Sequence, residues 1–364
     1  MNNTTIDLDQ NTTGLYFTPH YQESIPVKGI LLGVFAATIL GSLVGNIAVI
    51  RATCGMARTP VTYILVMNMA VAELVYTLSM SLSVIYLELE YWPYGVFMCK
   101  VIFPVQVIAK FVITTSIAAI SVRRYQMITG RSLRAPSKTC LRLTILGFWG
   151  LGLAVSIPLL IVLELVIYPP NPHSYCVDYF PGTQLEQATS AMQYSLARFI
   201  LGFVVPMVVM MISYGAVAVS LKQSISRQRL SRTRIDSLTP SVNTRLSTHS
   251  MDLVGPNGQR SLTVTSPTAD MESQPQEPNQ LIKHEKDLIR MFYIIIFVFV
   301  LFYFPYQIYF MIENNVLKDW YYVNLLRKSL LLLTFFPSAL HPVCYGTNNK
   351  FYARAFKRLF LCQC

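Results

Sequence analysis

Seven long apolar stretches dominate the sequence and leave little freedom in how the chain can fold. Most of them hold the roughly 20 apolar residues that a helix needs to cross a bilayer. A helix satisfies its own backbone hydrogen bonds inside hydrocarbon, so each stretch is expected to be a helix rather than a strand. The predicted fold is therefore all-α, a seven-transmembrane helix bundle over residues 27–346. The stretches cover residues 27–52, 61–87, 97–128, 141–163, 194–221, 288–313 and 320–346.

The composition agrees with a membrane protein. Hydrophobic residues make up 53% of the chain and charged residues 13%, whereas a soluble domain is about 25% charged. In a soluble protein the net charge of +11 would raise the question of nucleic acid. Here the Lys and Arg residues gather in loops on one side of the spans, and no run of basic and aromatic residues suggests a nucleic-acid groove. We expect membrane lipid, and no nucleic acid, as a partner.

The distribution of charge predicts the orientation of the spans. Most of the Lys and Arg residues outside the spans lie in the first, second and third inner loops and in the tail, while Glu88, Glu90 and Asp178 lie on the opposite side. The positive-inside rule places the N-terminus outside and the C-terminus in the cytoplasm of the plasma membrane. The polar leader, residues 1–26, lacks the apolar core of a cleavable signal peptide, so the first span is expected to act as the signal anchor. Candidate glycosylation sites in this leader are Asn2, Asn3 and Asn11.

Two segments on the cytoplasmic side differ in kind from the spans. Residues 223–283 are rich in Ser, Thr, Pro, Asn and Arg and are predicted to be a disordered loop, whose hydroxyls are phosphorylation candidates or simply solvated linker. In residues 347–364, apolar side chains such as Phe351 and Phe356 alternate with basic ones at helical spacing. This pattern favours a short amphipathic helix on the membrane surface over a merely basic tail. Cys362 and Cys364 follow it as acylation candidates.

An ordered set of short motifs accompanies the spans, and together they resemble the landmarks of class A (rhodopsin-like) G-protein-coupled receptors, in particular the neuropeptide receptor group. Each motif alone is weak, but their order along the chain is specific. The resemblance covers nearly all of the chain outside the leader and the third inner loop. The motifs are Gly45-Asn46-Ile47-Ala48-Val49, Asn68-Met69-Ala70-Val71-Ala72-Glu73, Trp92-Pro93-Tyr94-Gly95, Arg123-Arg124-Tyr125, Trp149, Pro206 with Tyr214, Phe299-Val300-Leu301-Phe302-Tyr303-Phe304-Pro305, and His341-Pro342-Val343-Cys344-Tyr345.

The resemblance implies a disulfide and a switch. Cys99 and Cys176 both lie toward the oxidising side and are expected to pair, which would tie the second outer loop to the third helix. Arg124 is expected to contact the G protein in the active state and to pair with Glu285 at rest; alternatively, Glu285 only neighbours Lys283 and Lys286 in water. The residues assigned to coupling and switching are Arg123, Arg124, Tyr125, Tyr214, Glu285, Glu73, His341, Pro342 and Tyr345.

Several of these residues depart from the family's pattern. Arg123 replaces the acid that normally restrains Arg124, so the resting state is expected to be less restrained. Glu73, Ile113 and His341 stand where the family usually carries Asp, Ser and Asn to hold a sodium ion, and sodium binding is predicted to be weak or absent. Glu73 and His341 are expected to pair, which would make the core sensitive to pH.

The ligand pocket is predicted between the outer halves of the third, fifth, sixth and seventh helices. Gln106 stands where amine receptors carry an Asp, which disfavours an amine ligand. Residues 164–193 are expected to form a hairpin lid after Cys176. The acidic outer loops favour a neuropeptide-like ligand with a basic or amidated end; the rival is a small carboxylate that contacts Lys110 and Arg198. The expected pocket residues are Gln106, Lys110, Arg198, Tyr303, Tyr306, Gln307, Glu313 and Arg327.

The favoured function is a cell-surface receptor, activated by an extracellular peptide, that couples to a heterotrimeric G protein through movement of the sixth helix. Arrestin and receptor kinases are further expected partners. An atypical receptor that signals through arrestin or not at all is one alternative, and a membrane transporter is another, although no repeated half is visible. An enzyme is not expected, because no nucleophile–base pair or metal cluster stands out, and no cofactor or metal is expected either.

Overall fold

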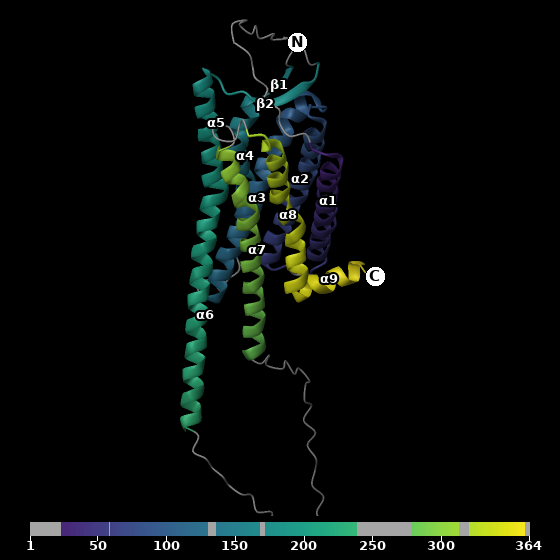
Figure 1. The fold of residues 1–364 in the computed structure, drawn as a ribbon. Helices are drawn as coiled ribbons and strands as arrows, with labels where there is room; N and C mark the ends of the chain where they lie inside the picture. Colours follow the sequence, from purple (N-terminus) through teal and green to yellow (C-terminus); the bar gives the residue numbers. More distant parts are fainter. Residues whose placement is uncertain are drawn as a thin grey trace, which may run out of the picture.

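The computed structural model describes residues 23–57, 59–129, 136–167, 172–238, 278–312 and 320–360. Within these ranges, 7 helices are long and apolar enough to cross a membrane, which confirms the expected bundle. Figure 1 shows them side by side, with their axes roughly parallel. They are α1 (Ile25–Cys54), α2 (Val61–Leu89), α3 (Gly95–Ile128), α4 (Lys138–Val162), the continuous helix made of α5 (Gln184–Phe199), η1 (Ile200–Val204) and α6 (Val205–Leu238), α7 (Pro278–Ile312) and α8 (Val323–Asn348).

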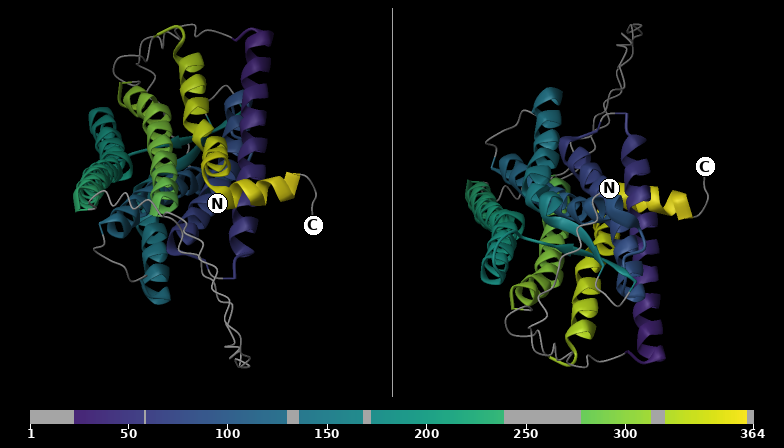
Figure 2. Two further views of the ribbon diagram at one scale, coloured as in Figure 1. Left: turned by 90° about the horizontal axis from the view of Figure 1, so that it is seen from below. Right: turned by 90° about the horizontal axis from the view of Figure 1, so that it is seen from above.

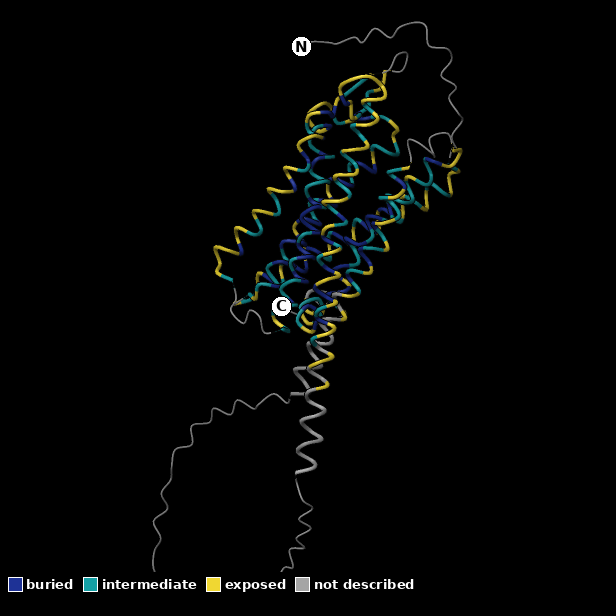
Figure 3. Tube along the Cα trace, turned by 90° about the vertical axis from the view of Figure 1, so that its left-hand side faces the viewer, coloured by how far each residue is buried: buried dark blue, intermediate teal, exposed yellow. Residues whose placement is uncertain are grey.

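The helix α3 lies at the centre of the packing. It contacts α2, α4 and α6, while α1 packs between α2 and α8, and α7 packs against α8. Views along the bundle show this arrangement (Figure 2). Buried residues such as Met69, Ile113 and Phe299 fill the interior, and exposed residues line the outside (Figure 3). Large apolar side chains, among them Leu143 and Leu146 of α4, are exposed on that outer surface, as expected of helices that face hydrocarbon.

One β-hairpin adds to the expected all-α fold. Strand β1 (Leu163–Ile167) pairs antiparallel with β2 (Ser174–Asp178) at one end of the bundle, called here the hairpin end. Cys176 of β2 forms the expected disulfide with Cys99 at the start of α3, with a Cα–Cα distance of 5.6 Å. A hairpin was expected within residues 164–193 and is present, but it does not follow Cys176 as predicted: Cys176 lies inside the second strand, and residues from Gln184 onward are helical.

The helix that contains α5 begins well before the expected start at residue 194. A capping box sets this start: the Glu186 backbone N–H donates to Thr183 Oγ1 at 3.4 Å, and the Thr183 backbone N–H donates to the Glu186 carboxylate at 2.7 Å. The first turns are polar, so apolar periodicity did not reveal them. At the far end, α6 continues to Leu238 and α7 begins at Pro278. The loop predicted over 223–283 is therefore shorter at both ends.

A π-helical turn joins α5 to α6. The turn η1 ends two residues before Pro206. Proline has no backbone N–H, so the carbonyl one turn earlier loses its usual helical partner. A wider turn relieves this mismatch without breaking the helix. Pro305 in α7 and Pro337 and Pro342 in α8 also lie inside their helices.

The short helix α9 (Lys350–Phe360) follows α8 at the end of the bundle opposite the hairpin, called here the α9 end. It runs roughly perpendicular to the long helices (Figures 1 and 2). Tyr352 shares a hydrogen bond of 3.2 Å with Thr53 of α1. Phe351 meets Tyr63 of α2 edge to face, with ring centroids 5.3 Å apart. The predicted C-terminal helix is confirmed, and these contacts anchor it to the bundle. The glycosylation candidates Asn2, Asn3 and Asn11 and the acylation candidates Cys362 and Cys364 lie outside the described residues.

Candidate functional site

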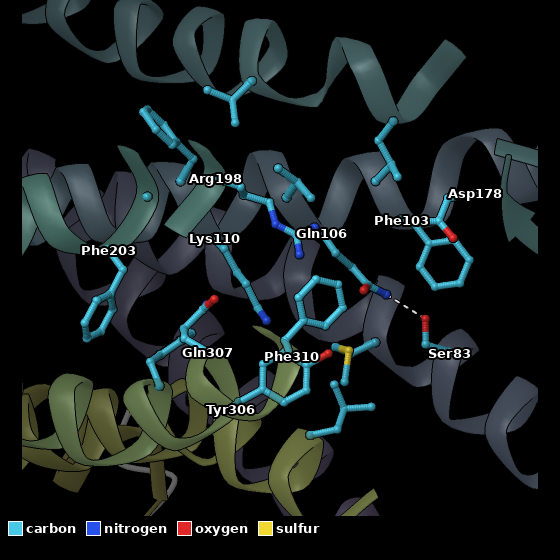
Figure 4. Close-up of a pocket in the computed structure, with 18 of the residues that line it drawn as sticks. Ser83, Phe103, Gln106, Lys110, Asp178, Arg198, Phe203, Tyr306, Gln307 and Phe310 are labelled. Atoms are coloured by element: carbon cyan, nitrogen blue, oxygen red, sulfur yellow. Dashed lines mark hydrogen bonds between the residues drawn. The ribbon is translucent and has the colours of Figure 1, made fainter. Parts of the chain in front are cut away.

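A cavity of about 330 Å³ opens within the bundle beneath the hairpin. Residues from α2, α3, α4, α5, η1, α7 and α8 line it together with Leu163 of β1 and with Cys176 and Asp178 of β2. Figure 4 shows the side chains that converge on it. Of the expected pocket residues, Glu313 lies outside the described part of the chain. The others all line the cavity: Gln106, Lys110, Arg198, Tyr303, Tyr306, Gln307 and Arg327.

The structure adds lining residues that the sequence did not reveal. Helix α2 contributes Met80, Ser83 and Leu87, which recur at helical spacing on one face. The hairpin contributes Asp178. A signal for Asp178 was present, because the bond between Cys176 and Cys99 brings the residues that follow Cys176 above α3. No comparable signal marked α2, since serines such as Ser83 also occur on the other faces of this span.

Lys110 lies deep in the cavity among aromatic rings. Its ammonium is 4.9 Å from the ring centroid of Tyr76, 5.5 Å from that of Tyr306 and 5.7 Å from that of Tyr303. Tyr76 and Tyr303 are buried, whereas Lys110 is half-buried because it also faces the cavity. The rings attract the cation through their electron-rich faces.

A second cation approaches the same space from α5. The guanidinium carbon of Arg198 is 5.0 Å from the ring centroid of Phe310 and 5.5 Å from that of Tyr194. In Figure 4 the charged ends of Arg198 and Lys110 both point into the cavity. The walls therefore present positive charge together with aromatic surface.

Gln106 and Asp178 lie nearer the mouth of the cavity. The Gln106 amide donates to Ser83 Oγ at 2.6 Å and to the Ser79 carbonyl at 3.1 Å, so it joins α3 to α2. Asp178 is exposed as a whole residue. Desolvation of its carboxyl nevertheless raises its pKa, and this effect outweighs a backbone hydrogen bond and the charge of Arg198, which both lower the pKa. This carboxyl is thus less completely charged than a free aspartate would be at mildly acidic pH.

In the middle of the bundle, Glu73 of α2 and His341 of α8 are in direct contact. The imidazole Nδ1 and the carboxylate Oε1 share a hydrogen bond, and the exposed fractions of the two side chains are 1% and 0%. Ile113 is fully buried and offers no oxygen. Asn46 donates to the Ser338 carbonyl at 3.0 Å and so joins α1 to α8. The structure brings together the pair expected from the sequence.

Toward the α9 end, the expected switch residues occupy the core. Arg124 is buried on α3, and its neighbour Arg123 donates to Gln126 at 2.8 Å along the same helix. Tyr125 is half-buried beside them. The side chain of Glu285 in α7 lies outside what the structure describes, so its pairing with Arg124 stays a prediction.

The aromatic switch residues are also buried. Tyr214 of α6 receives a hydrogen bond at its carbonyl from the Tyr293 hydroxyl of α7, at 3.3 Å. The Tyr345 hydroxyl of α8 lies 3.3 Å from Met69 Sδ of α2. Pro342 is buried one turn before Tyr345. These contacts join the helices whose relative positions would have to change in a switch.

Among the described residues, no group of three or more His, Cys, Asp or Glu side chains is arranged to hold a metal ion. Glu73 and His341 are instead paired with each other across helices α2 and α8. The cavity has the size range and the mostly apolar walls of a site for part of an organic ligand.

Comparisons with known proteins identify the family. The family described as "7 transmembrane receptor (rhodopsin family)" matches residues 45–345. The Neuropeptide F receptor of Drosophila melanogaster is 30% identical over 227 residues, which cover 57% of this chain and 44% of that protein. The Neuropeptides B/W receptor type 2 of Bos taurus is 30% identical over 204 residues, covering 54% and 59%. The Tachykinin-like peptides receptor 86C of Drosophila melanogaster is 23% identical over 348 residues, covering 93% and 60%. The matched region thus spans less than two thirds of each of these relatives.

Proposed function

Because this chain belongs to the rhodopsin family of seven-transmembrane receptors, we propose that it is a cell-surface receptor for an extracellular neuropeptide-like ligand and that it couples to a heterotrimeric G protein. The observation that carries the proposal is the cavity beneath the hairpin, where polar groups from several helices converge between aromatic walls. Relatives named as receptors for neuropeptide F and for neuropeptides B/W support the ligand class.

The size of the cavity suggests how a peptide would bind. A volume of about 330 Å³ is at the small end of ligand sites. It accommodates the end of a peptide rather than a whole one. The disulfide between Cys99 and Cys176 holds the hairpin at the mouth, and the rest of the peptide would lie along this hairpin and the neighbouring loops.

Tyr303 provides a route from the ligand to the G protein. It lies in the cavity wall on α7, two residues before Pro305, and its ring centroid is 4.9 Å from that of Phe299. Phe299 in turn is 5.3 Å from Phe203 of η1. A ligand that displaces Tyr303 would shift this stack and move the α9 end of α7. That movement would free Arg124 to contact the G protein.

A screen with parallel readouts tests the proposal. Cells that express the full chain are exposed to a peptide library, and G-protein activation and arrestin recruitment are both measured. A saturable G-protein response to a peptide is the expected result. Recruitment of arrestin without any G-protein response would instead support an atypical receptor, which the departures at Arg123 and His341 motivate. Saturable uptake of a substrate would support a transporter.

The resting lock between Arg124 and Glu285 is tested separately. Glu285→Ala should raise ligand-independent signalling, because it removes the acid that would restrain Arg124. Asp287→Ala is the matched control, since it removes an acid of the same charge two residues further along the sequence, and positions two residues apart do not share a face of a helix. Unchanged basal activity in Glu285→Ala would rule out the lock.

The proposed orientation places the hairpin end outside the cell and the α9 end in the cytoplasm, where arrestin and receptor kinases would act. An epitope tag at the N-terminus should be detected on intact cells, and a tag at the C-terminus only after permeabilisation. Loss of a glycan-dependent mass shift in Asn11→Gln would add support for the outward N-terminus. A tag pattern of the opposite kind would overturn the orientation.

A further inference from the structure

We propose that the deep end of the cavity is an anion subsite that binds a carboxylate of the ligand, with Lys110 as its main contact and Arg198 as its second. This inference rests on the proposed receptor function and names the chemistry of the ligand end that enters the bundle. A peptide with a free C-terminal carboxylate, or a small organic acid, would provide that group.

The surroundings of Lys110 are aromatic rather than acidic. Its ammonium is surrounded by the rings of Tyr76, Tyr303 and Tyr306, and within the described residues no salt bridge joins it to an acid. A cation held inside a protein is costly unless an opposite charge compensates it. Aromatic faces supply only about 0.5–2 kcal/mol of that compensation. The site is therefore incomplete without an anion.

Arg198 brings a second positive charge to the same cavity. Arg198 and Lys110 both line the cavity, and in Figure 4 their charged ends extend into the same part of it. Like charges repel across a low-dielectric cavity. An anion between them would turn this repulsion into two attractive contacts, and a guanidinium can hold both oxygens of a carboxylate at once.

The remaining polar lining offsets this positive charge only at Arg198, on which Asp178 acts, and not at Lys110. Asp178 belongs to the hairpin and is exposed; in Figure 4 it lies beside Phe103, away from Lys110. The amide nitrogen of Gln106 already donates to Ser83. The deep end thus has an excess of positive charge, whereas the acid lies toward the mouth.

This charge arrangement reverses the sequence-based expectation for the buried end of the ligand. The acidic residues of the outer loops led to the expectation of a basic or amidated end. The described side chains place the acid at the hairpin and the cations deep. A ligand that enters with its carboxylate first would place this group beside the deep cations. Any basic residues of the ligand would then remain beside the acid at the hairpin. An amidated terminus would leave Lys110 without a counter-charge.

Matched acid and amide probes test the subsite directly. The full-length receptor, purified in detergent, is heated with N-acetylphenylalanine or with its amide, which differ only in the carboxylate. Two peptide pools of identical sequences are tested in parallel, one with free C-terminal carboxylates and one amidated. The measurement is the unfolding midpoint as a function of probe concentration. The acids should raise the midpoint at concentrations at which the amides do not.

Variants connect this preference to Lys110. Lys110→Met keeps the length of the side chain and removes its charge, so it should weaken the binding of the acids about tenfold to a hundredfold, as expected for a charged hydrogen bond. Arg198→Gln should weaken it less. Lys100→Met is the matched control, because Lys100 lies on α3 about three turns nearer the hairpin end and does not line the cavity. Lys110→Met itself should fold, since it removes an uncompensated cation from the bundle.

The outcomes separate the subsite from the proposed function. Equal binding of acids and amides, or an acid preference that persists in Lys110→Met, would overturn the subsite and leave a peptide receptor intact. Stabilisation by N-acetylphenylalanine but by neither peptide pool would support the subsite, identify a small acid as the ligand and overturn the peptide proposal. If no probe shifts the midpoint, both are overturned.

Discussion

Glu73 and His341 show how single residues define the middle of this bundle. The carboxylate of Glu73 and the imidazole of His341 are in direct contact between α2 and α8. Both side chains are buried. A buried pair of this kind gives limited net stability when compared with an apolar pair, but loss of one partner leaves the other without compensation.

A double-mutant cycle measures this pairing. Glu73→Gln and His341→Asn should each lower the unfolding midpoint of the purified receptor, corresponding to about 3–5 kcal/mol if the remaining partner stays charged and buried. The double variant should lose less than the sum, because the two amides can bond to each other. Strictly additive losses would show that the two side chains do not interact.

The same pair leads to a prediction about sodium. The Glu73 carboxylate already contacts His341, and the buried Ile113 side chain offers no oxygen ligand. The unfolding midpoint should therefore be the same in sodium chloride as in choline chloride at equal concentration. A rise in midpoint that is specific to sodium would contradict this. Measurement with the His341→Asn variant, which places an amide oxygen near Glu73, serves as the comparison.

At the scale of elements, the contact of α1 with α8 depends on a glycine. A Cβ atom added at Gly45 would lie 2.6 Å from Cβ and 2.8 Å from Cγ of Pro342. A proline ring inside a helix cannot rotate away as a flexible side chain would. The two helices therefore approach as closely as they do only because residue 45 has no side chain.

Gly45→Ala should destabilise the protein. The helix gains about 1 kcal/mol of propensity from alanine, but overpacking costs about 1–3 kcal/mol, so a net fall in the unfolding midpoint is expected. Gly147→Ala and Gly150→Ala in α4 are the controls, because a Cβ at either site meets nothing within 4 Å. If Gly45→Ala raised the midpoint as much as the controls do, the close approach of α1 and α8 would be refuted.

The hairpin is the second element whose position depends on one contact. The disulfide between Cys99 and Cys176 closes a sequence separation of 77 residues. Removal of such a link typically costs about 2–5 kcal/mol. Cys99→Ser, Cys176→Ser and the double variant should reduce surface expression and the unfolding midpoint to a similar extent. Cys140→Ser, at an exposed free cysteine, should leave both unchanged; a large effect there would point to another bond.

At the scale of the whole molecule, a charged cluster closes the hairpin end. Lys328 of α8 lies 3.0 Å from Glu23 and 3.3 Å from Glu88, and Lys28 of α1 lies 2.9 Å from Glu88. The side chains of Lys328, Glu23 and Glu88 are largely buried, whereas that of Lys28 is 45% exposed. The cluster joins the start of α1, the end of α2 and the start of α8.

The burial of these groups determines which variant is harmful. Lys328→Met should lower the unfolding midpoint strongly, because two carboxylates then face each other without a buried cation. Lys28→Met should have a small effect, since exposed ion pairs contribute about 0–1 kcal/mol. High salt should reduce the effect of Lys28 more than that of Lys328. Similar losses in the two variants would show that burial does not govern the cluster.

Features that depend on neighbouring residues followed from the sequence more accurately than features that depend on contacts between distant residues. All seven spans were found because each contains a continuous apolar run, and five of them begin and end within a few residues of the predicted bounds. The hairpin was misplaced: Ser174–Asp178 alternates like a strand, but its partner Leu163–Ile167 reads as an extension of the apolar fourth span. The polar ends of the helices Gln184–Leu238 and Pro278–Ile312 carried no apolar periodicity, so those helices were predicted too short.

The sequence alone determined the number of spans, the order of the motifs and the identity of the ionisable residues in the bundle, since hydropathy and short spacing are properties of neighbouring residues. Only the tertiary structure decided which of these residues meet. Glu73 and His341 are separated by 268 positions, and Tyr76 joined the rings around Lys110 although α2 was not expected to line the pocket. Such contacts depend on how each helix is rotated against its neighbours, and that rotation is set by the packing of all the side chains at once.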